Sequence, residues 1–195
     1  MRLFAPLYDT ALRLAGHRHA ERYMAALSVA ESVIFPVPPD VMLAPMTLAR
    51  PSGWWRFALI CTVASVVGGL LGYALGWLAL DAIWPLVERL GKAETFAEVS
   101  GLFQQYGFWI VFLAGFTPIP YKVFTIAAGA TGIGLLPFLL ASLVGRGGRF
   151  FLVTGLMAWG GARMEKTLRR YVEALGWVAV LLVVVGLAWW EWQRP

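Results

Sequence analysis

The chain has 195 residues, of which 59% are hydrophobic and only 14% are charged, and its mean hydropathy is +0.70. A soluble domain carries about 25% charged residues, so this chain has too few charges to cover the surface of a water-soluble globule. Ten Trp and 21 Gly residues agree with membrane spans, where both residue types are enriched. The composition excludes an ordinary soluble domain and predicts an all-α integral membrane protein, folded as one membrane domain over 1–195.

The net charge of +5 and the single cysteine restrict partners and sites. The basic residues are spread over short loops, so we expect anionic membrane lipids as partners and no nucleic acid. Cys61 excludes an intrachain disulfide and a cysteine-built metal site, and we interpret it as a packing residue. His17 and His19 lie in a basic stretch that we interpret as a solvated face, so no metal site and no cofactor are expected. Arg13, Arg18 and Arg22 interrupt the N-terminal apolar residues, which argues against a cleavable signal peptide.

The first 49 residues predict two different membrane-associated elements. Residues 1–22 mix Arg and His with apolar residues and predict an amphipathic helix at the membrane interface. Residues 23–49 are apolar but are interrupted by Pro36, Pro38 and Pro39. Because proline removes a backbone donor and clashes with the preceding turn, no continuous helix can cross the membrane here.

The segment 57–80 is the clearest span. Its 24 residues carry no charge and would form about 36 Å of helix, enough for a hydrocarbon core of about 30 Å. Gly68, Gly72 and Gly76 repeat at every fourth position within it. This spacing places the glycines on one face, which we interpret as a surface for close helix packing.

The second half of the chain repeats this pattern. Residues 86–105 are polar, with apolar residues at helical spacing, and predict a second interfacial helix. Residues 106–131 are apolar but are broken by Pro118 and Pro120. Two further segments are long enough or apolar enough to span the membrane, 136–162 and 174–190.

An internal repeat relates the two halves. The hexamers 36–41 and 118–123 match as proline, β-branched residue, proline, any residue, charged residue and valine, at an offset of 82 residues. The same offset places 57–80 over 139–162. Broken helices at corresponding positions of two halves indicate a transporter's binding site near the membrane midplane. We therefore expect two inverted-topology repeats, each a proline-broken re-entrant hairpin (23–49 or 106–131) followed by a transmembrane helix.

The distribution of positive charge allows two topologies. With re-entrant hairpins, ten Lys and Arg residues lie inside and three outside, and the count is the same if both broken segments cross the membrane. The positive-inside rule therefore predicts a cytoplasmic N-terminus without choosing between them. Broken backbone exposed to lipid costs several kcal/mol for each unpaired group. We favour re-entrant hairpins that enter from opposite faces, because their tips would then meet inside the protein.

Five ionisable residues fall within the membrane segments and form the candidate substrate- or ion-binding site: Glu31, Asp40, Lys122, Arg146 and Arg149. An isolated charge at the bilayer centre costs about 2.5–3.5 kcal/mol, so these side chains should face one another or a water-filled cavity. Two acids and three bases leave one positive charge, which suits an anionic group such as a phosphate. Half-helices that begin after Pro39 and Pro120 would add positive N-termini. The alternative interpretation is a set of ion pairs that only stabilise the fold.

The order of these motifs resembles the DedA superfamily (the VTT or SNARE-associated domain), in particular its short YqaA-like branch, over roughly residues 20–165. The resemblance rests on Glu31-Ser32, the proline-rich 35–40, the glycines of 68–76, and the run from Phe116-Thr117-Pro118 to 127–129. It implies a bacterial inner (plasma) membrane protein with two facing re-entrant hairpins. It also implies lipid translocation, as a flippase or scramblase for phospholipids or polyprenyl-phosphate carriers, often linked to the proton-motive force.

The resemblance also assigns roles by position. Glu31 and Asp40 match the acidic residues of the family's first hairpin. The second motif of the family usually contains two arginines, whereas here Gly115 stands at the first position and Lys122 approximates the second. The two arginines within 136–162 are candidates to replace the missing charge.

We therefore favour a transporter that moves an anionic lipid, either a phospholipid or a polyprenyl-phosphate carrier. Carboxylates can take up and release protons, so Glu31 or Asp40 could couple transport to protons. A carrier of a small solute or ion through the same midplane cavity is the alternative. An enzyme such as a lipid phosphatase is not favoured, because the membrane segments hold no His and no nucleophile with an adjacent base. A structural scaffold and a homo-oligomer both stay open.

Overall fold

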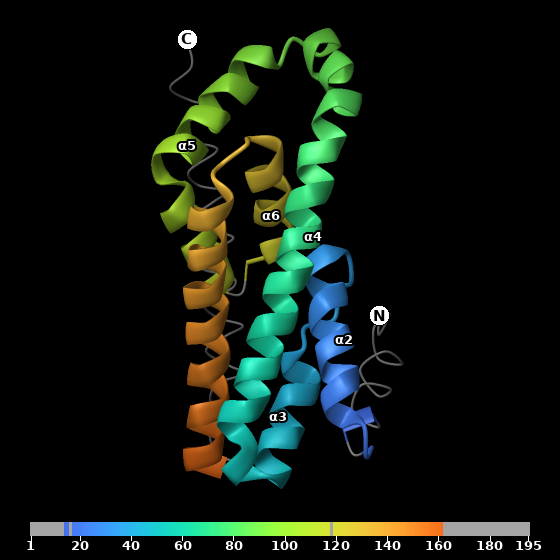
Figure 1. Ribbon diagram of the computed structural model, residues 1–195, viewed down its shortest axis with the longest axis vertical. Coiled ribbons are helices and arrows are strands. Elements are labelled where there is room, and N and C mark those ends of the chain that lie inside the picture. The colour runs from blue at the N-terminus through green and yellow to red at the C-terminus, as the bar shows by residue number, and fades with distance from the viewer. Residues whose placement is uncertain (1–13, 16, 118, 162–195) are drawn as a thin grey trace, which may run out of the picture.

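The computed structural model describes residues 14–15, 17–117 and 119–161 (Figure 1). These residues form helices and no strand, so the predicted all-helical architecture is confirmed over them. In chain order the helices are α2 (Ala20–Val33), α3 (Asp40–Ala49), the 3-10 helix η1 (Pro51–Gly53), α4 (Trp54–Arg89), α5 (Ala93–Phe116), α6 (Tyr121–Ala130) and the helix Leu135–Gly161. Of the predicted terminal elements, 174–190 and most of 1–22 lie outside the described residues.

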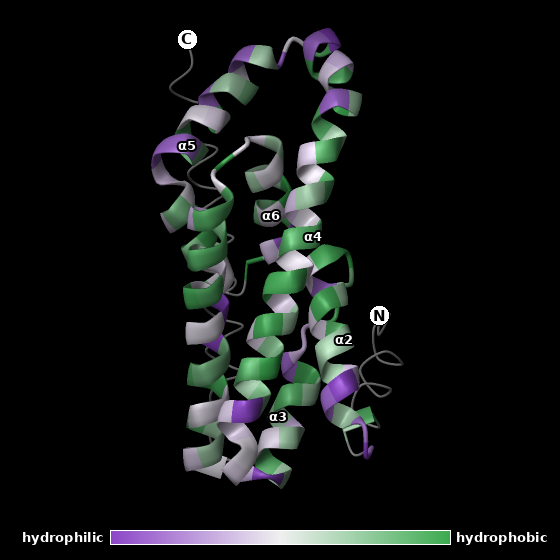
Figure 2. Ribbon diagram, viewed as in Figure 1, coloured by the Kyte–Doolittle hydropathy of each residue, from purple (hydrophilic) through white to green (hydrophobic). Residues whose placement is uncertain are grey.

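Three of these helices are long and apolar enough to cross a membrane: Pro51–Arg89, Ala93–Phe116 and Leu135–Gly161. On α4, a stripe of large apolar side chains is exposed at near-helical spacing, including Leu59, Val63, Val67, Leu71 and Leu75. Such a surface is unfavourable in water and suits contact with lipid tails. Hydrophilic residues gather at the bend between α4 and α5 in Figure 2, at one end of the molecule. The chain is therefore a membrane protein.

The end of α4 differs from the prediction. The helix continues beyond residue 80 to Arg89, and Trp84 stabilises this extension by donating its indole N–H to Glu88 at 2.8 Å. Gly91 follows the C-cap residue Leu90, and its positive φ of 63° allows a Schellman motif. In that motif the N–H groups of Gly91 and Lys92 donate to the carbonyls of Glu88 and Val87 at 2.9 and 3.0 Å. The prediction of one interfacial helix over 86–105 was wrong, because the chain turns within it.

The start of the second hairpin also differs. Helix α5 runs without interruption from Ala93 to Phe116, across the predicted boundary at 105/106. Apolar residues at helical spacing continue from the polar segment before residue 105 into the apolar segment after it. No helix breaker such as proline lies between the two segments, so one helix forms. It ends where Thr117 becomes extended (ψ 164°), as expected for a residue that precedes a proline.

Both proline-rich segments interrupt helices. Helix α2 ends at Val33 and α3 begins at Asp40 after Pro39, and α6 begins at Tyr121 directly after Pro120. Pro36 and Pro38 lie between α2 and α3, whereas Pro118 is outside the described residues. In Figure 1 the chain reverses at each interruption, with α2 and α3 in the lower half of the molecule and α6 in the upper half. The membrane depth of these hairpins and the twofold relation between the halves stay predictions.

Helix α4 packs against both hairpins. A Cβ atom on Gly68 would lie 2.6 Å from the carbonyl oxygen of Val29 in α2, and one on Gly76 would lie 1.9 Å from the carbonyl oxygen of Ile126 in α6. Between them, a Cβ on Gly72 would lie 2.4 Å from the hydroxyl of Thr125. The glycine face therefore allows α2 and α6 to approach α4 at backbone distance, which brings the two interruptions close together.

Candidate functional site

Arg146 is the most enclosed charged residue of the described chain. It lies near the middle of Leu135–Gly161 and is only 1% exposed. Its guanidinium donates to the Glu31 carboxylate at 2.7 Å through one terminal nitrogen and to the Ser65 hydroxyl at 2.6 Å through Nε. The same group lies 4.9 Å from the ring centroid of Tyr121 and 4.8 Å from that of Phe150, which are cation–π distances. Arg146 thus joins α2, α4, α6 and its own helix.

A chain of serines extends this contact into α2. Because guanidinium nitrogens only donate, the Ser65 hydroxyl accepts from Arg146 and is left to donate to the hydroxyl of Ser32, 2.8 Å away. Ser32 then donates to the carbonyl of Ser28 at 2.9 Å. All three serines are fully buried. The sequence interpretation missed them, although the i, i+4 spacing of Ser28 and Ser32 in an apolar helix was a usable signal.

A second ion pair lies one turn further along the helix Leu135–Gly161. Arg149 donates to the Asp40 carboxylate at 2.5 Å and to the backbone carbonyl of Thr117 at 3.2 Å. Asp40 is the first residue of α3, where the helix dipole stabilises a negative charge. The side chains of Arg149 and Asp40 are 13% and 25% exposed, compared with 2% for Arg146. The other carboxylate oxygen of Asp40 is buried and accepts no hydrogen bond within the described part of the chain.

Lys122 contacts the first interruption rather than a carboxylate. Its ammonium group donates to the carbonyls of Ile34 and Phe35 at 2.9 and 3.3 Å. These carbonyls follow the C-terminus of α2, where the helix dipole favours a cation. Lys122 therefore connects the second interruption to the first.

The structure brings the five predicted residues to the two interruptions. Both acids come from the first hairpin, and both ion-paired arginines come from the long helix of the second half. Gly115, at the position where the family usually has an arginine, lies against Arg146: a Cβ there would be 3.3 Å from the Arg146 backbone nitrogen and 3.4 Å from its Cγ.

Other residues that the sequence singled out lie apart from this cluster. Cys61 is fully buried in an apolar cluster with Met24 and Phe57. The Nδ1 atom of His17 accepts a hydrogen bond from the backbone N–H of His19 at 3.2 Å, at the start of α2. Within the described ranges, no group of three or more His, Cys, Asp or Glu side chains is placed to hold a metal ion.

Long apolar helices around buried and half-buried side chains of opposite charge define a polytopic membrane protein with a polar interior. A family model described as the VTT domain matches residues 37–159. The chain therefore belongs to the VTT domain (DedA) family, and the resemblance seen in the sequence is confirmed.

Three relatives show what the chain is similar to. A Haemophilus influenzae protein named only as uncharacterized is 41% identical over 186 residues, which cover 95% of this chain and 97% of that protein. Undecaprenyl phosphate transporter A of Staphylococcus aureus is 27% identical over 128 residues, or 61% of this chain and 63% of that one. An alkaline phosphatase-like protein of Lactococcus lactis is 28% identical over 132 residues, with coverages of 63% and 62%. No solved structure matches the chain.

Proposed function

We propose that the protein transports an anionic lipid, a phospholipid or a polyprenyl phosphate, across the bacterial inner membrane, with its N-terminus in the cytoplasm. The observation that carries this proposal is the pair of interior ion pairs, Glu31–Arg146 and Asp40–Arg149, at the interrupted helices. Stability alone is a weak reason to retain them, because well-packed apolar residues are often as stable as a buried ion pair. The family relative named as an undecaprenyl phosphate transporter supports a lipid that carries phosphate.

The lengths of α2 and α3 support a site at mid-membrane depth. Glu31 follows Glu21 by ten positions along α2, and α3 has ten residues. The stretch from Glu21 to Glu31 and the whole of α3 therefore each span about 15 Å. This is half of a hydrocarbon core of about 30 Å. Trp54 and Trp55 begin α4 at the open end of the α2–α3 hairpin, and Trp is typical of the membrane interface. With that end at the interface, the hairpin is re-entrant and both ion pairs lie near the midplane.

The repeated order of elements supports an inverted pair of such hairpins. In each half a helix is followed by a proline-rich interruption, a helix of ten residues and a long helix. Hairpins that enter from opposite faces would place α3 and α6 on opposite sides of the midplane, as their separation in Figure 1 suggests. Access could then alternate between the two membrane faces around one central site.

We assign different roles to the two arginines. Arg146 is enclosed and held by a carboxylate, a serine and two aromatic rings, which suits a fixed anchor. Arg149 is more accessible, and a phosphate can compete with Asp40 for its planar guanidinium through paired hydrogen bonds. Protonation of Asp40 would remove its negative charge and free Arg149 for the phosphate. This exchange would link lipid movement to protons.

Lipid movement in proteoliposomes tests the assignment to Arg149. The full chain is reconstituted with a fluorescent phosphatidylglycerol or a fluorescent polyprenyl phosphate, and the rate of exchange between leaflets is measured. We expect Arg149→Gln to slow exchange at least tenfold and Arg149→Lys to slow it less. Arg89→Gln is the matched control, because Arg89 is exposed at the end of α4 and lies outside the site. Wild-type exchange by Arg149→Gln would contradict the proposal.

The same vesicles separate the alternatives. Uptake of soluble phosphate or another small anion without lipid exchange would indicate a solute carrier. Release of phosphate from the lipid by the purified protein would instead indicate a lipid phosphatase.

A further inference from the structure

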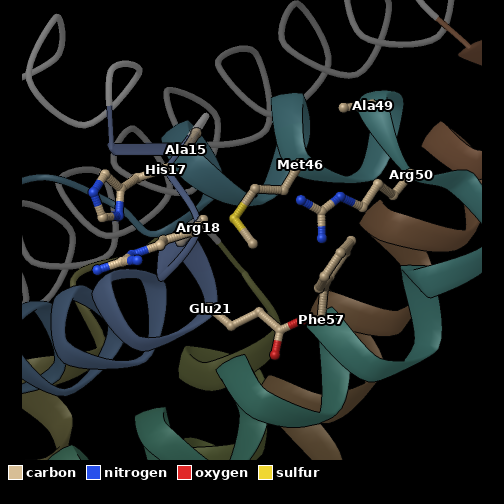
Figure 3. A pocket seen from close by; sticks show the side chains of 9 residues that line it. Ala15, His17, Arg18, Glu21, Met46, Ala49, Arg50 and Phe57 are labelled. Carbon is tan, nitrogen blue, oxygen red and sulfur yellow. The ribbon is translucent and has the colours of Figure 1, made fainter.

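A polar pocket lies away from the central ion pairs, at the open end of the α2–α3 hairpin (Figure 3). It encloses about 170 Å³, room for several water molecules at about 30 Å³ each. Its floor is apolar and buried, formed by Ala20, Met46 and Phe57, and its polar lining includes Arg18, Glu21 and Arg50. We propose that this pocket binds the phosphate group of an anionic lipid at the membrane surface.

The charges of the pocket favour an anion. Glu21 is already neutralised by Arg56, which donates to its carboxylate at 2.7 Å. Arg18 and Arg50 have no side-chain hydrogen bond or ion pair with any described residue. In Figure 3 the Arg50 guanidinium points toward Met46 and Phe57, and Arg18 lies on the opposite side of the pocket. The Arg50 guanidinium, unpaired among the described residues, therefore faces the pocket, whereas the Arg18 guanidinium lies at its edge and points outward in Figure 3.

The apolar floor distinguishes a lipid from a soluble anion. A free phosphate would gain nothing from contact with Met46 and Phe57, whereas the glycerol and upper chain atoms of a lipid would remove them from water. Trp54 and Trp55 lie between the lining residues Arg50 and Phe57 in the chain, and Trp is typical of the depth at which lipid headgroups are found. The first turn of α2 adds the positive end of a helix dipole at the same place.

This pocket and the central site are joined by the same two helices. Arg50 follows the end of α3, which begins at Asp40, and Glu21 and Glu31 lie at opposite ends of α2. A headgroup held at the surface would therefore stand about 15 Å along α3 from the Asp40–Arg149 pair. Binding in the pocket does not depend on transport, so the two proposals can fail separately.

Equilibrium binding of lipid tests the pocket. The detergent-solubilised full chain is titrated with dioleoyl phosphatidylglycerol, and bound lipid is counted by native mass spectrometry. We expect Arg50→Gln to weaken binding about tenfold, and Arg50→Lys to weaken it less because Lys keeps the charge but loses the planar fork. Arg22→Gln is the matched control, since Arg22 is exposed in the same first turn of α2 and does not line the pocket. Lipid binding by this control should weaken by no more than about twofold.

Competition with inorganic phosphate identifies the source of the phosphate. Failure of millimolar inorganic phosphate to displace the lipid would support a lipid site that uses the apolar floor. Displacement at these concentrations would overturn the lipid assignment in favour of a soluble anion. Equal losses in Arg50→Gln and Arg22→Gln would overturn the pocket itself, because diffuse surface charge would then explain the binding. Thermal unfolding of each variant verifies that the weaker binding does not reflect misfolding.

Discussion

Replacement of Arg146 by methionine should destabilise the protein strongly, and the structure indicates by how much. Removing one partner of a buried ion pair costs about 3–5 kcal/mol, against a total stability of about 5–15 kcal/mol for a typical protein. The Glu31 carboxylate left behind is 16% exposed and can be partly hydrated. We therefore expect a loss near the lower limit, about 3 kcal/mol.

The reverse substitution should cost more. Glu31→Leu leaves the Arg146 guanidinium charged and almost completely enclosed, so we expect a loss near about 5 kcal/mol. The double variant, Glu31→Leu with Arg146→Met, leaves no unpaired charge. It should lose less than the sum of the two single variants, with a coupling of about 2–4 kcal/mol.

The single cysteine provides the assay. Cys61 is fully buried on α4, and its backbone carbonyl accepts from the Ser28 hydroxyl at 3.0 Å, beside the serine chain that leads to Arg146. A thiol-reactive fluorescent maleimide therefore reports unfolding at one defined position. For a chain of this size, about 3 kcal/mol corresponds to a fall in Tm of roughly 6–12 °C.

Two results would refute this reasoning. If the stability losses of Arg146→Met and Glu31→Leu were additive in the double variant, the two side chains would not be paired in the membrane-embedded protein. If Arg149→Met destabilised the protein more than Arg146→Met, the anchoring role would belong to the more exposed arginine instead. Arg89→Met serves as the control and should leave Tm within about 2 °C, because an exposed surface change is worth about 0.5 kcal/mol or less.

Two further substitutions follow from contacts of the glycine face and of the second interruption. Gly76→Ala should lower the free energy of unfolding by at least about 2 kcal/mol, because its Cβ would lie 1.9 Å from the Ile126 carbonyl oxygen. Its control is Gly101→Ala, in open space on α5, which should be neutral or slightly stabilising in the same thiol assay. Lys122→Met should lower the free energy of unfolding by only about 1 kcal/mol in that assay but slow lipid exchange in proteoliposomes. The reason is that the Ile34 carbonyl would lose the cation that connects the two interruptions. An unchanged exchange rate would show that transport does not need this contact.

Local patterns in the sequence were sufficient for much of the fold. A charge-free stretch predicted the span at 57–80, and apolar length predicted the one at 136–162. The first lies within Pro51–Arg89 and the second matches Leu135–Gly161 over the described residues, and clustered prolines predicted where α2 and α5 end. These features depend on a residue and its near neighbours, so no tertiary information was needed. The boundary at 105/106 failed because a change in polarity does not interrupt a helix in the absence of a breaker.

The five charged residues could be selected from the sequence, but their partners could not. Arg146 pairs with Glu31 across 115 residues, and Arg149 pairs with Asp40 across 109. The exchanged pairing, with each arginine bound to the other acid, would have agreed equally well with the sequence. Lys122 could also have paired with either acid. Ser65 lacks any charge that would have drawn attention to it.

By itself the sequence determined that the chain is a helical membrane protein with two broken segments and five interior charges, because hydrophobicity, proline geometry and the cost of burying charge act locally. Only the tertiary structure decided which acid meets which base, that Lys122 binds carbonyls, and that serines orient Arg146. These choices depend on the rotation and depth at which α2, α4 and α6 pack together. The close backbone approaches at Gly68 and Gly76, and the packing of the Thr125 side chain on Gly72, set that register.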